Sequence, residues 1–461
     1  MNKKKTKEEF NKMINLPEMF YQPDNDKIWM KDGRRRYVPY RKGAVVTRLE
    51  HEYEMPRKES AELFAKTYKD HVVDLVTPIG GWPKGMHEIS GKKVLVPWEQ
   101  RRIEPKEGDW EIIRKFLTGM LGTEQLEYYK GWLQIWLSGF YNYKFVPGQV
   151  LIAVGETSSG KTLLKTIHNH IVGGGGQPLK YMTGGTGFNG ELCEVCSLHI
   201  DDKLNDLGLQ GKKKLKAECK ELAVAGEWRY EFKNKTAFTA SPVQRLLICC
   251  NYTEDSVSVI PDIDESTRNK ISILHCKRNK MPMPARTQSE KDAFWKQIES
   301  EMPAFIYHVL NEHKISDKFA DSEEERMGVR GYHHPKALNY VETYSSDGSR
   351  LLGIIEVLRS DPENSLYWEG SAGDLVQFLR KKDYDNRSTP TSMGRFLNQR
   401  IACGTKLVKD NGHRKYWIDT KTREDDDEPP PKSEVEESPT KVEKKSKEDL
   451  FEDEDDYYGK A

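Results

Sequence analysis

The segment Val150-Leu-Ile-Ala-Val-Gly-Glu-Thr-Ser-Ser-Gly-Lys-Thr162 joins a short apolar run to a glycine-bounded loop that ends in a lysine and a threonine. The apolar run predicts a buried strand, and apolar residues at helical spacing after Thr162 predict a helix. A strand, a glycine loop and a helix start in this order are the phosphate-binding P-loop pattern. An ordinary glycine turn is the alternative, and the flanking strand and helix argue against it. The sequence therefore predicts a site for a nucleoside triphosphate.

The backbone and the last two side chains of this loop suggest its chemistry. Glycines allow successive N–H groups to face one anion, and the helix N-terminus adds partial positive charge. We expect Lys161 to reach the β- and γ-phosphates of ATP, and the Thr162 hydroxyl to bind Mg²⁺. The residues expected to hold the nucleotide are Gly155, Glu156, Thr157, Ser158, Ser159, Gly160, Lys161 and Thr162.

Two further strand ends are predicted to complete this site. Residues 195–200 form an apolar run that ends in Asp201 and Asp202, and residues 245–250 form another that ends in Asn251. A carboxylate pair downstream of a P-loop suits Mg²⁺ and the attacking water, so we assign Asp201 mainly to the metal and Asp202 mainly to the water. We expect Asn251 to bond the γ-phosphate or that water. A turn-initiating Asn is the alternative.

Basic residues in the same region are candidates for contacts outside the protomer. Arg268 is the candidate arginine finger for a neighbouring subunit, and a surface arginine in a local ion pair is an equally weighted alternative. Residues 228–235 alternate aromatic and basic side chains before an Asn-centred turn, which predicts a β-hairpin. We expect Arg229, Lys233 and Lys235 of this hairpin to grip a nucleic-acid backbone.

The C-terminal part predicts a separate small domain. Helices are expected at 351–358, 371–379 and 391–400, and a hairpin with an Asn-Gly turn at 406–418. Three helices followed by a hairpin predict a winged-helix domain, which binds DNA or docks another protein. The side chains expected to contact DNA are Arg395, Gln399, Arg400, His413, Arg414 and Lys415.

The N-terminal part predicts a mixed region and then a helical block. Strand-like runs at 27–30, 44–49 and 93–97 lie between turn signals, and residues 109–140 show helical spacing with many aromatic residues. We interpret this aromatic density as core packing.

Composition and charge describe a chain of several domains. Its 461 residues suffice for two to four domains, and 32% are charged. No run has the length of a transmembrane helix or the pattern of a signal peptide, so we expect a cytoplasmic protein without membrane contact. Residues 424–461 hold sixteen acidic and six basic side chains, so the remainder is net basic although the whole chain is neutral. This split predicts nucleic-acid contact by the body.

The order of the motifs at 155–162, 200–202, 233–235 and 247–251, followed by Arg268, resembles superfamily 3 helicases. The chain is similar to the helicase module of phage or plasmid primase-helicases and of poxvirus-type primase-helicases. The resemblance implies a P-loop AAA+-like ATPase core that uses ATP and Mg²⁺, assembles as a hexameric ring and translocates on DNA. Two positions depart from the pattern, because many relatives have Glu at the place of Asp202 and a paired arginine at Arg268 and Asn269.

The expected fold class is therefore α/β, with six segments along the chain. These are an N-terminal α+β region (1–105), a helical block (106–144), the P-loop ATPase (145–310), a helical connector (311–349), the winged-helix domain (350–420) and a disordered acidic tail (421–461).

The expected function is an ATP-dependent DNA helicase or translocase of a phage or other mobile element, acting in replication in the host-cell cytoplasm. The expected partners are DNA, further copies in a homo-hexamer, and a separate primase, polymerase or single-strand-binding protein at the acidic tail. The alternatives for the tail are an internal mimic of DNA and, with equal weight, a solubilising segment. The alternative function is an ATP-switched DNA-binding initiator or regulator that does not translocate. A small-molecule kinase is a third and weaker interpretation.

Overall fold

The computed structural model describes residues 17–32, 36–201, 209–233, 236–257, 260–261, 263–321, 327–344, 346–364, 367–384, 388–399, 405–410 and 413–420. Asp202, Lys235, Arg400 and the acidic tail lie outside these ranges, so the predictions made for them stay predictions. The side chains of Gln399, His413 and Arg414 also lie outside the description. The predicted domain boundaries likewise stay predictions.

Five parallel strands form the central sheet, in the order β13-β7-β12-β9-β8. They are β7 (Val150–Gly155), β8 (Gly175–Gly176), β9 (Ser197–Ile200), β12 (Arg245–Asn251) and β13 (Ile271–Cys276). Every residue of β7 is buried, as expected for a central parallel strand that is covered on both faces. The strands predicted from the apolar runs before Gly155, Asp201 and Asn251, and the α/β class with a parallel sheet, are therefore confirmed.

The chain reverses its direction of winding at β7. After β7 it runs to the far edge at β8, returns through β9 and β12, and then crosses β7 to reach β13. Open parallel sheets bind ligands at such a switch point, beyond the carboxyl ends of the strands. Helix α5 (Lys161–Val172) begins at this place and ends at Gly173, whose φ of 76° is left-handed.

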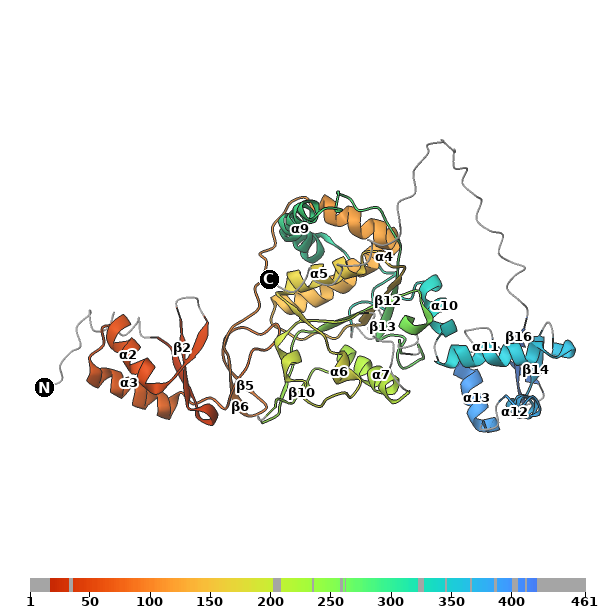
Figure 1. Cartoon of the computed structure of the whole chain (residues 1–461), viewed down its shortest axis with the longest axis horizontal. Coiled ribbons are helices and arrows are strands. Elements are labelled where there is room, and N and C mark those ends of the chain that lie inside the picture. Colours follow the sequence, from red (N-terminus) through yellow and green to blue (C-terminus); the bar gives the residue numbers. More distant parts are fainter. Residues whose placement is uncertain are drawn as a thin grey trace, which may run out of the picture.

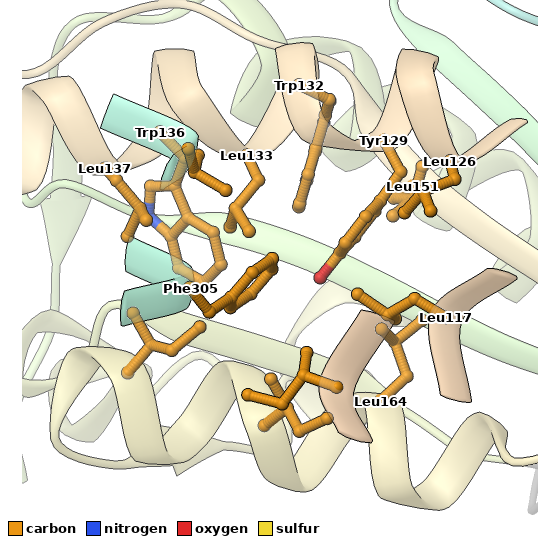
Figure 2. Packing of buried hydrophobic residues seen from close by; sticks show 14 of the residues in the cluster. Leu117, Leu126, Tyr129, Trp132, Leu133, Trp136, Leu137, Leu151, Leu164 and Phe305 are labelled. Carbon is orange, nitrogen blue, oxygen red and sulfur yellow. The ribbon is translucent and has the colours of Figure 1, made fainter. Parts of the chain in front are cut away.

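One face of the sheet is covered by the aromatic helix α4 (Glu111–Tyr141), by α5 and by α9 (Gln288–Tyr307), which continues as a single wider turn, η3 (His308–Glu312). Figure 2 shows Trp132 and Trp136 of α4 in this core together with Leu164 of α5 and Phe305 of α9. Gly122, at φ 74° and ψ 173°, bends α4. The interpretation of the aromatic segment as core packing is confirmed.

The other face carries helices, turns and two small sheets. The helices and turns are α6 (Leu179–Met182), η2 (Gly190–Glu194), α7 (Leu209–Val224), α8 (Glu254–Val257) and α10 (Pro335–Tyr344). The strands are β4 (Leu75–Val76), β5 (Gly85–Ile89) and β6 (Lys92–Val96) of one small sheet, with β10 (Trp228–Tyr230) and β11 (Phe238–Ala240) of another. Strands β10 and β11 are antiparallel, which confirms the predicted hairpin.

The N-terminal unit lies at one end of the long axis (Figure 1). It contains β1 (Met19–Gln22), the turn η1 (Pro23–Asn25), β2 (Lys27–Lys31), β3 (Tyr37–Tyr40), α2 (Lys42–Glu52) and α3 (Arg57–Asp70). The strand predicted at 44–49 is wrong, because these residues belong to α2. Val45 and Leu49 are both fully buried, and their spacing of four places them on one face of a helix.

Part of the predicted helical connector is instead extended. Ile273 of β13 donates its N–H to the Tyr332 carbonyl at 2.7 Å, and accepts from the N–H of His334 at 2.9 Å. This short segment therefore lies along β13 as an added edge of the central sheet. Only α10 and the start of the next helix are helical between residue 313 and residue 349 within the described ranges, so the helical prediction is wrong for the rest.

The C-terminal unit lies at the opposite end of the long axis (Figure 1). Its elements are α11 (Ser346–Arg359), η4 (Pro362–Asn364), β14 (Tyr367–Gly370), α12 (Ala372–Lys381), α13 (Pro390–Gln399), β15 (Thr405–Asp410) and β16 (His413–Asp419). The three predicted helices and the hairpin are confirmed. Strand β14 was not predicted, and it pairs with β16 so that the sheet order is β14-β16-β15.

The described part of the chain contains no helix that combines the length and the apolar character needed to span a bilayer.

We expect Trp132→Ala to lower the free energy of unfolding by about 3–5 kcal/mol in urea denaturation. Trp132 is 1% exposed, and its indole N–H donates to the Gln149 carbonyl at 2.9 Å, so the change leaves a cavity and an unpaired carbonyl. Trp98→Ala is the matched control, since Trp98 is 39% exposed, and it should cost about 0.5 kcal/mol or less. Equal losses in both variants would contradict the core assignment.

Candidate functional site

The glycines of the P-loop fit places where a side chain has no room. A Cβ at Gly155 would overlap the carbonyl oxygen of Cys276 at the end of β13. Gly160 has a φ of 95°, and a Cβ there would lie 2.7 Å from the Phe116 ring of α4. Ser158 also adopts a positive φ, of 63°. The loop is therefore confined between β13 and α4. Lack of space favours glycine at residue 155, and both lack of space and the left-handed backbone favour it at residue 160.

The ammonium group of Lys161 lies inside this loop. It donates to the Gly155 carbonyl at 3.0 Å, the Glu156 carbonyl at 2.8 Å and the Ser159 hydroxyl at 3.2 Å. It also donates to the Asn251 side-chain oxygen at 2.9 Å, which joins the loop to the end of β12. Lys161 is 7% exposed. The structure thus brings together two of the predicted catalytic side chains, and places a buried cation where phosphates are expected.

Asp201 follows β9 directly and faces the same helix. Its Oδ2 atom accepts a hydrogen bond from the Lys165 ammonium at 2.7 Å. Thr162, the predicted metal ligand, is exposed in the first turn of α5 and lies three residues before Lys165, so both are on one side of the helix. Sequence analysis missed Lys165. The signal available was its position one turn after the P-loop lysine.

Tyr252 continues the site beyond Asn251. Its hydroxyl lies 2.6 Å from Nδ1 of His275, and the ammonium of Lys336 lies 5.9 Å from the centre of its ring. Burial raises the pKa of Tyr252, and the nearby Glu156 carboxylate adds to this. Burial, with neighbouring His334 and lysines, lowers the pKa of His275 to about 4, so His275 is neutral near pH 7. On the β13 side the site therefore has a neutral histidine and a tyrosine, with the Lys336 ammonium beside them.

Arg268 lies away from the P-loop of its own chain. It precedes β13, whereas the P-loop follows β7, and the two strands are parallel. Six residues of strand separate the two ends by roughly 20 Å. Arg268 is exposed and forms no ion pair with any residue in the described ranges. Arg268 therefore lies at the surface, as both interpretations of this residue require. The local ion pair, which was the alternative to an arginine finger, is not found among the described residues.

The basic hairpin shares a surface with a second loop. The Asn189 side chain donates to the Arg229 carbonyl at 3.0 Å and accepts from the Glu231 N–H at 2.8 Å. Phe188, next to Asn189, is 52% exposed. Lys233 is exposed, while Arg229 pairs with Glu231 at 3.1 Å. Sequence analysis missed Phe188, although an aromatic residue in a Gly-Thr-Gly context was the available signal.

In the C-terminal unit, Arg395 is exposed on α13. Lys415 of β16 lies 4.0 Å from Glu369 of β14. The adjacent Tyr416 donates to the Gly394 carbonyl of α13 at 3.2 Å. Because neighbouring residues of a strand point to opposite faces, Lys415 points away from α13. The predicted DNA-contacting side chains that can be placed therefore lie on two different faces.

No family model matches this chain, and no curated protein matches it. Solved structures do match, among them two apo structures of the NrS-1 C-terminal region. One, the A form, has a TM-score of 0.52 at 15% identity and covers 88% of this chain and 97% of that chain. The other has a TM-score of 0.52 at 16% identity, with 88% and 96% covered. The chain therefore shares the fold of that region.

A structure described as the active helicase SCCmec type IV Cch also matches, with a TM-score of 0.29 at 9% identity and coverage of 84% and 70%. This likeness is too weak to bear on the fold.

We expect Gly155→Ala to weaken ATP binding at the P-loop about tenfold or more, measured by isothermal titration calorimetry. The added methyl group displaces either the Cys276 carbonyl or the Gly155 carbonyl that Lys161 holds. Gly43→Ala is the matched control, because a Cβ there meets nothing within 4 Å. A loss of affinity in the control, or none at Gly155, would show that the steric argument is wrong.

Proposed function

We propose that this protein is an ATP-dependent DNA helicase or translocase of a phage or other mobile element, and that it works as a ring in replication. The observation that carries the proposal is the convergence at the carboxyl edge of the sheet. Lys161 of the P-loop contacts Asn251 of β12 at 2.9 Å, and Asp201 directly follows the neighbouring strand, β9. The fold shared with the NrS-1 C-terminal region is compatible with this reading, and the function itself rests on the site.

The nucleotide would occupy the residues from Gly155 to Thr162. Lys161 would exchange its carbonyl and hydroxyl acceptors for the β- and γ-phosphates, and Asn251 would follow it toward the γ-phosphate. A hydroxyl from Thr162 and a carboxylate from Asp201 are hard oxygen ligands, so this donor set fits Mg²⁺. When bound, the ion would supply charge neutralisation for the phosphates. Asp202 is our candidate for orienting the attacking water.

Arg268 would act on a neighbouring copy. It is exposed at the amino edge of the sheet, far from its own P-loop, so only a head-to-tail neighbour could receive it. A ring closed by such contacts, for which we propose six copies, would place each Arg268 at the next γ-phosphate.

The hairpin and the Phe188 loop would form the strand-binding surface. Lys233, Lys235 and Arg229 would contact phosphates, and the exposed Phe188 ring would stack on a base. The two loops are held together by the Asn189 hydrogen bonds, so they would move as one body.

The C-terminal unit would be a winged-helix domain. Its order of helix, strand, two helices and hairpin supports this proposal. Its DNA contacts would come from Arg395, Gln399, Arg400, His413, Arg414 and Lys415. The acidic tail would dock a separate primase, polymerase or single-strand-binding protein in the host cytoplasm.

The second candidate is an ATP-switched DNA-binding initiator that does not translocate. The C-terminal unit favours it, because that unit has its own core and could bind duplex DNA without a motor. Unwinding of a forked duplex separates the two functions.

We expect Lys161→Ala to reduce DNA-stimulated ATP hydrolysis and fork unwinding together, by about 100-fold or more, because the buried cation at the phosphates is lost. Phosphate release and a fluorescent forked duplex measure the two activities. Lys296→Ala, at an exposed position of α9, is the control and should match the wild type. If the wild type hydrolyses ATP but does not unwind a fork when loading factors are supplied, the helicase proposal is wrong and the ATP-switched initiator is the better explanation.

The two strand-binding side chains should differ in their response to salt. Phe188→Ala should cost about 1 kcal/mol or more of single-stranded DNA binding and leave the salt slope unchanged. Lys233→Ala should weaken binding and reduce that slope by about 1. Fluorescence anisotropy at several salt concentrations measures both, with Met281→Ala, an exposed apolar residue, as control. If both variants bind single-stranded DNA as tightly as the wild type, this surface does not contact the DNA.

A further inference from the structure

Asp201 is already paired with a cation. Its Oδ2 atom lies 2.7 Å from the Lys165 ammonium, and both side chains are shielded, at 35% and 17% exposure. The pair joins the end of β9 to the second turn of α5. The pair is therefore part of the nucleotide site, and Lys165 has no role in the P-loop chemistry proposed above.

Lys165 and the metal would compete for the same place. Thr162 lies three residues before Lys165 on the same side of α5, and Asp201 faces that side from β9. An ion held between Thr162 and Asp201 would lie within a few ångströms of the Lys165 ammonium. Like charges at such distances repel strongly in a partly buried site. A metal ion at Asp201 would therefore weaken the Lys165 contact, and the Lys165 ammonium would weaken the binding of the metal ion.

A second acceptor for Lys165 lies on the same face of the sheet. His199 precedes Asp201 by two residues, and side chains so spaced along a strand share one face. His199 stands opposite Leu247 in register, and Leu247 belongs to the core that α5 covers. The Nδ1 atom of His199 is buried and has no hydrogen-bond partner among the described residues. An unprotonated histidine nitrogen accepts a hydrogen bond.

We propose that Lys165 is a two-position lysine that controls metal entry. It pairs with Asp201 while the site is empty, and it moves to Nδ1 of His199 when Mg²⁺ arrives with the nucleotide. The inference rests on the proposed binding of ATP and Mg²⁺ at the P-loop. Lys165 acts through Asp201, so it is a positioning residue.

Titration of Mg²⁺ in the full-length protein tests this proposal. The probe is the fluorescent N-methylanthraniloyl derivative of β,γ-imido-ATP, whose binding is followed at increasing MgCl₂ and also in EDTA. Lys165→Met removes the competing cation, so the MgCl₂ concentration for half-maximal binding should fall about fivefold. Lys165→Arg keeps the cation and is the matched control. Binding in EDTA is measured for each variant, and the MgCl₂ dependence is compared relative to that value, so that a direct effect of the Lys165 charge on the nucleotide is separated from its effect on the metal.

His199→Leu should have the opposite effect on the MgCl₂ concentration for half-maximal binding. It removes the acceptor of the released lysine, so the MgCl₂ requirement should rise. In the double variant His199→Leu/Lys165→Met, the histidine change should have no further effect, because the lysine is absent. Equal effects of His199→Leu in both backgrounds would assign His199 a role that does not involve Lys165.

The outcomes separate this inference from the proposed function. If the wild type binds no nucleotide at any MgCl₂ concentration, the proposed function fails. If it binds, and Lys165→Met needs the same MgCl₂ or more, the two-position lysine is overturned while nucleotide binding stands. If Lys165→Met shows no thermal unfolding transition, Lys165→Gln replaces it. A lower MgCl₂ requirement in Lys165→Gln supports the two-position lysine, and an equal or higher one overturns it.

Discussion

The burial of β7 on both faces is the constraint on which this structure depends. Strand β7 lies between β12 and β13, and its apolar side chains lie on both faces of the sheet. Other elements must therefore pack against both faces. The aromatic residues of α4 supply one cover, and α7 and α10 contribute to the other. Since β7 is thus fixed, the loop that follows it is fixed too. The glycines at 155 and 160 then let β13 and α4 approach closely enough to shape the anion site.

Much of the site could be predicted because its information is local. Strands β7 and β9 are short apolar runs that are followed by the P-loop and by Asp201, and β12 is another that ends in Asn251. Parallel strands bring such ends to one edge of the sheet. The contact between Lys161 and Asn251 follows from that rule, although the two residues are ninety positions apart in sequence. The pairing of Lys165 with Asp201 does not follow from that rule, because the sequence around a lysine in a helix does not indicate which carboxylate it will contact.

The wrong predictions share a physical cause. The run 44–49 has β-branched residues in sequence, yet Val45 and Leu49 are buried together because the sheet of the N-terminal unit presents one apolar face to a helix. The segment around Tyr332 is polar and gives no strand pattern, and it is extended because β13 leaves an unpaired edge. Strand β14 is similarly defined by its partner β16. In each case a segment that is distant in the sequence determines the local structure. The periodicity of the local sequence gives no information about that partner.

The edge segment at β13 also sets the mechanics of the chain beyond it. Tyr332 and His334 are bonded to the sheet immediately before α10 begins, so this helix starts from a clamped base. A ten-residue helix extends about 15 Å. Because Ala337 and Val341 of α10 are buried against the sheet, a shift of β13 would be carried along the helix toward the C-terminal unit. Lys336 in the first turn of α10 lies 5.9 Å from the centre of the Tyr252 ring, so such a shift would mechanically connect the nucleotide site with the C-terminal unit.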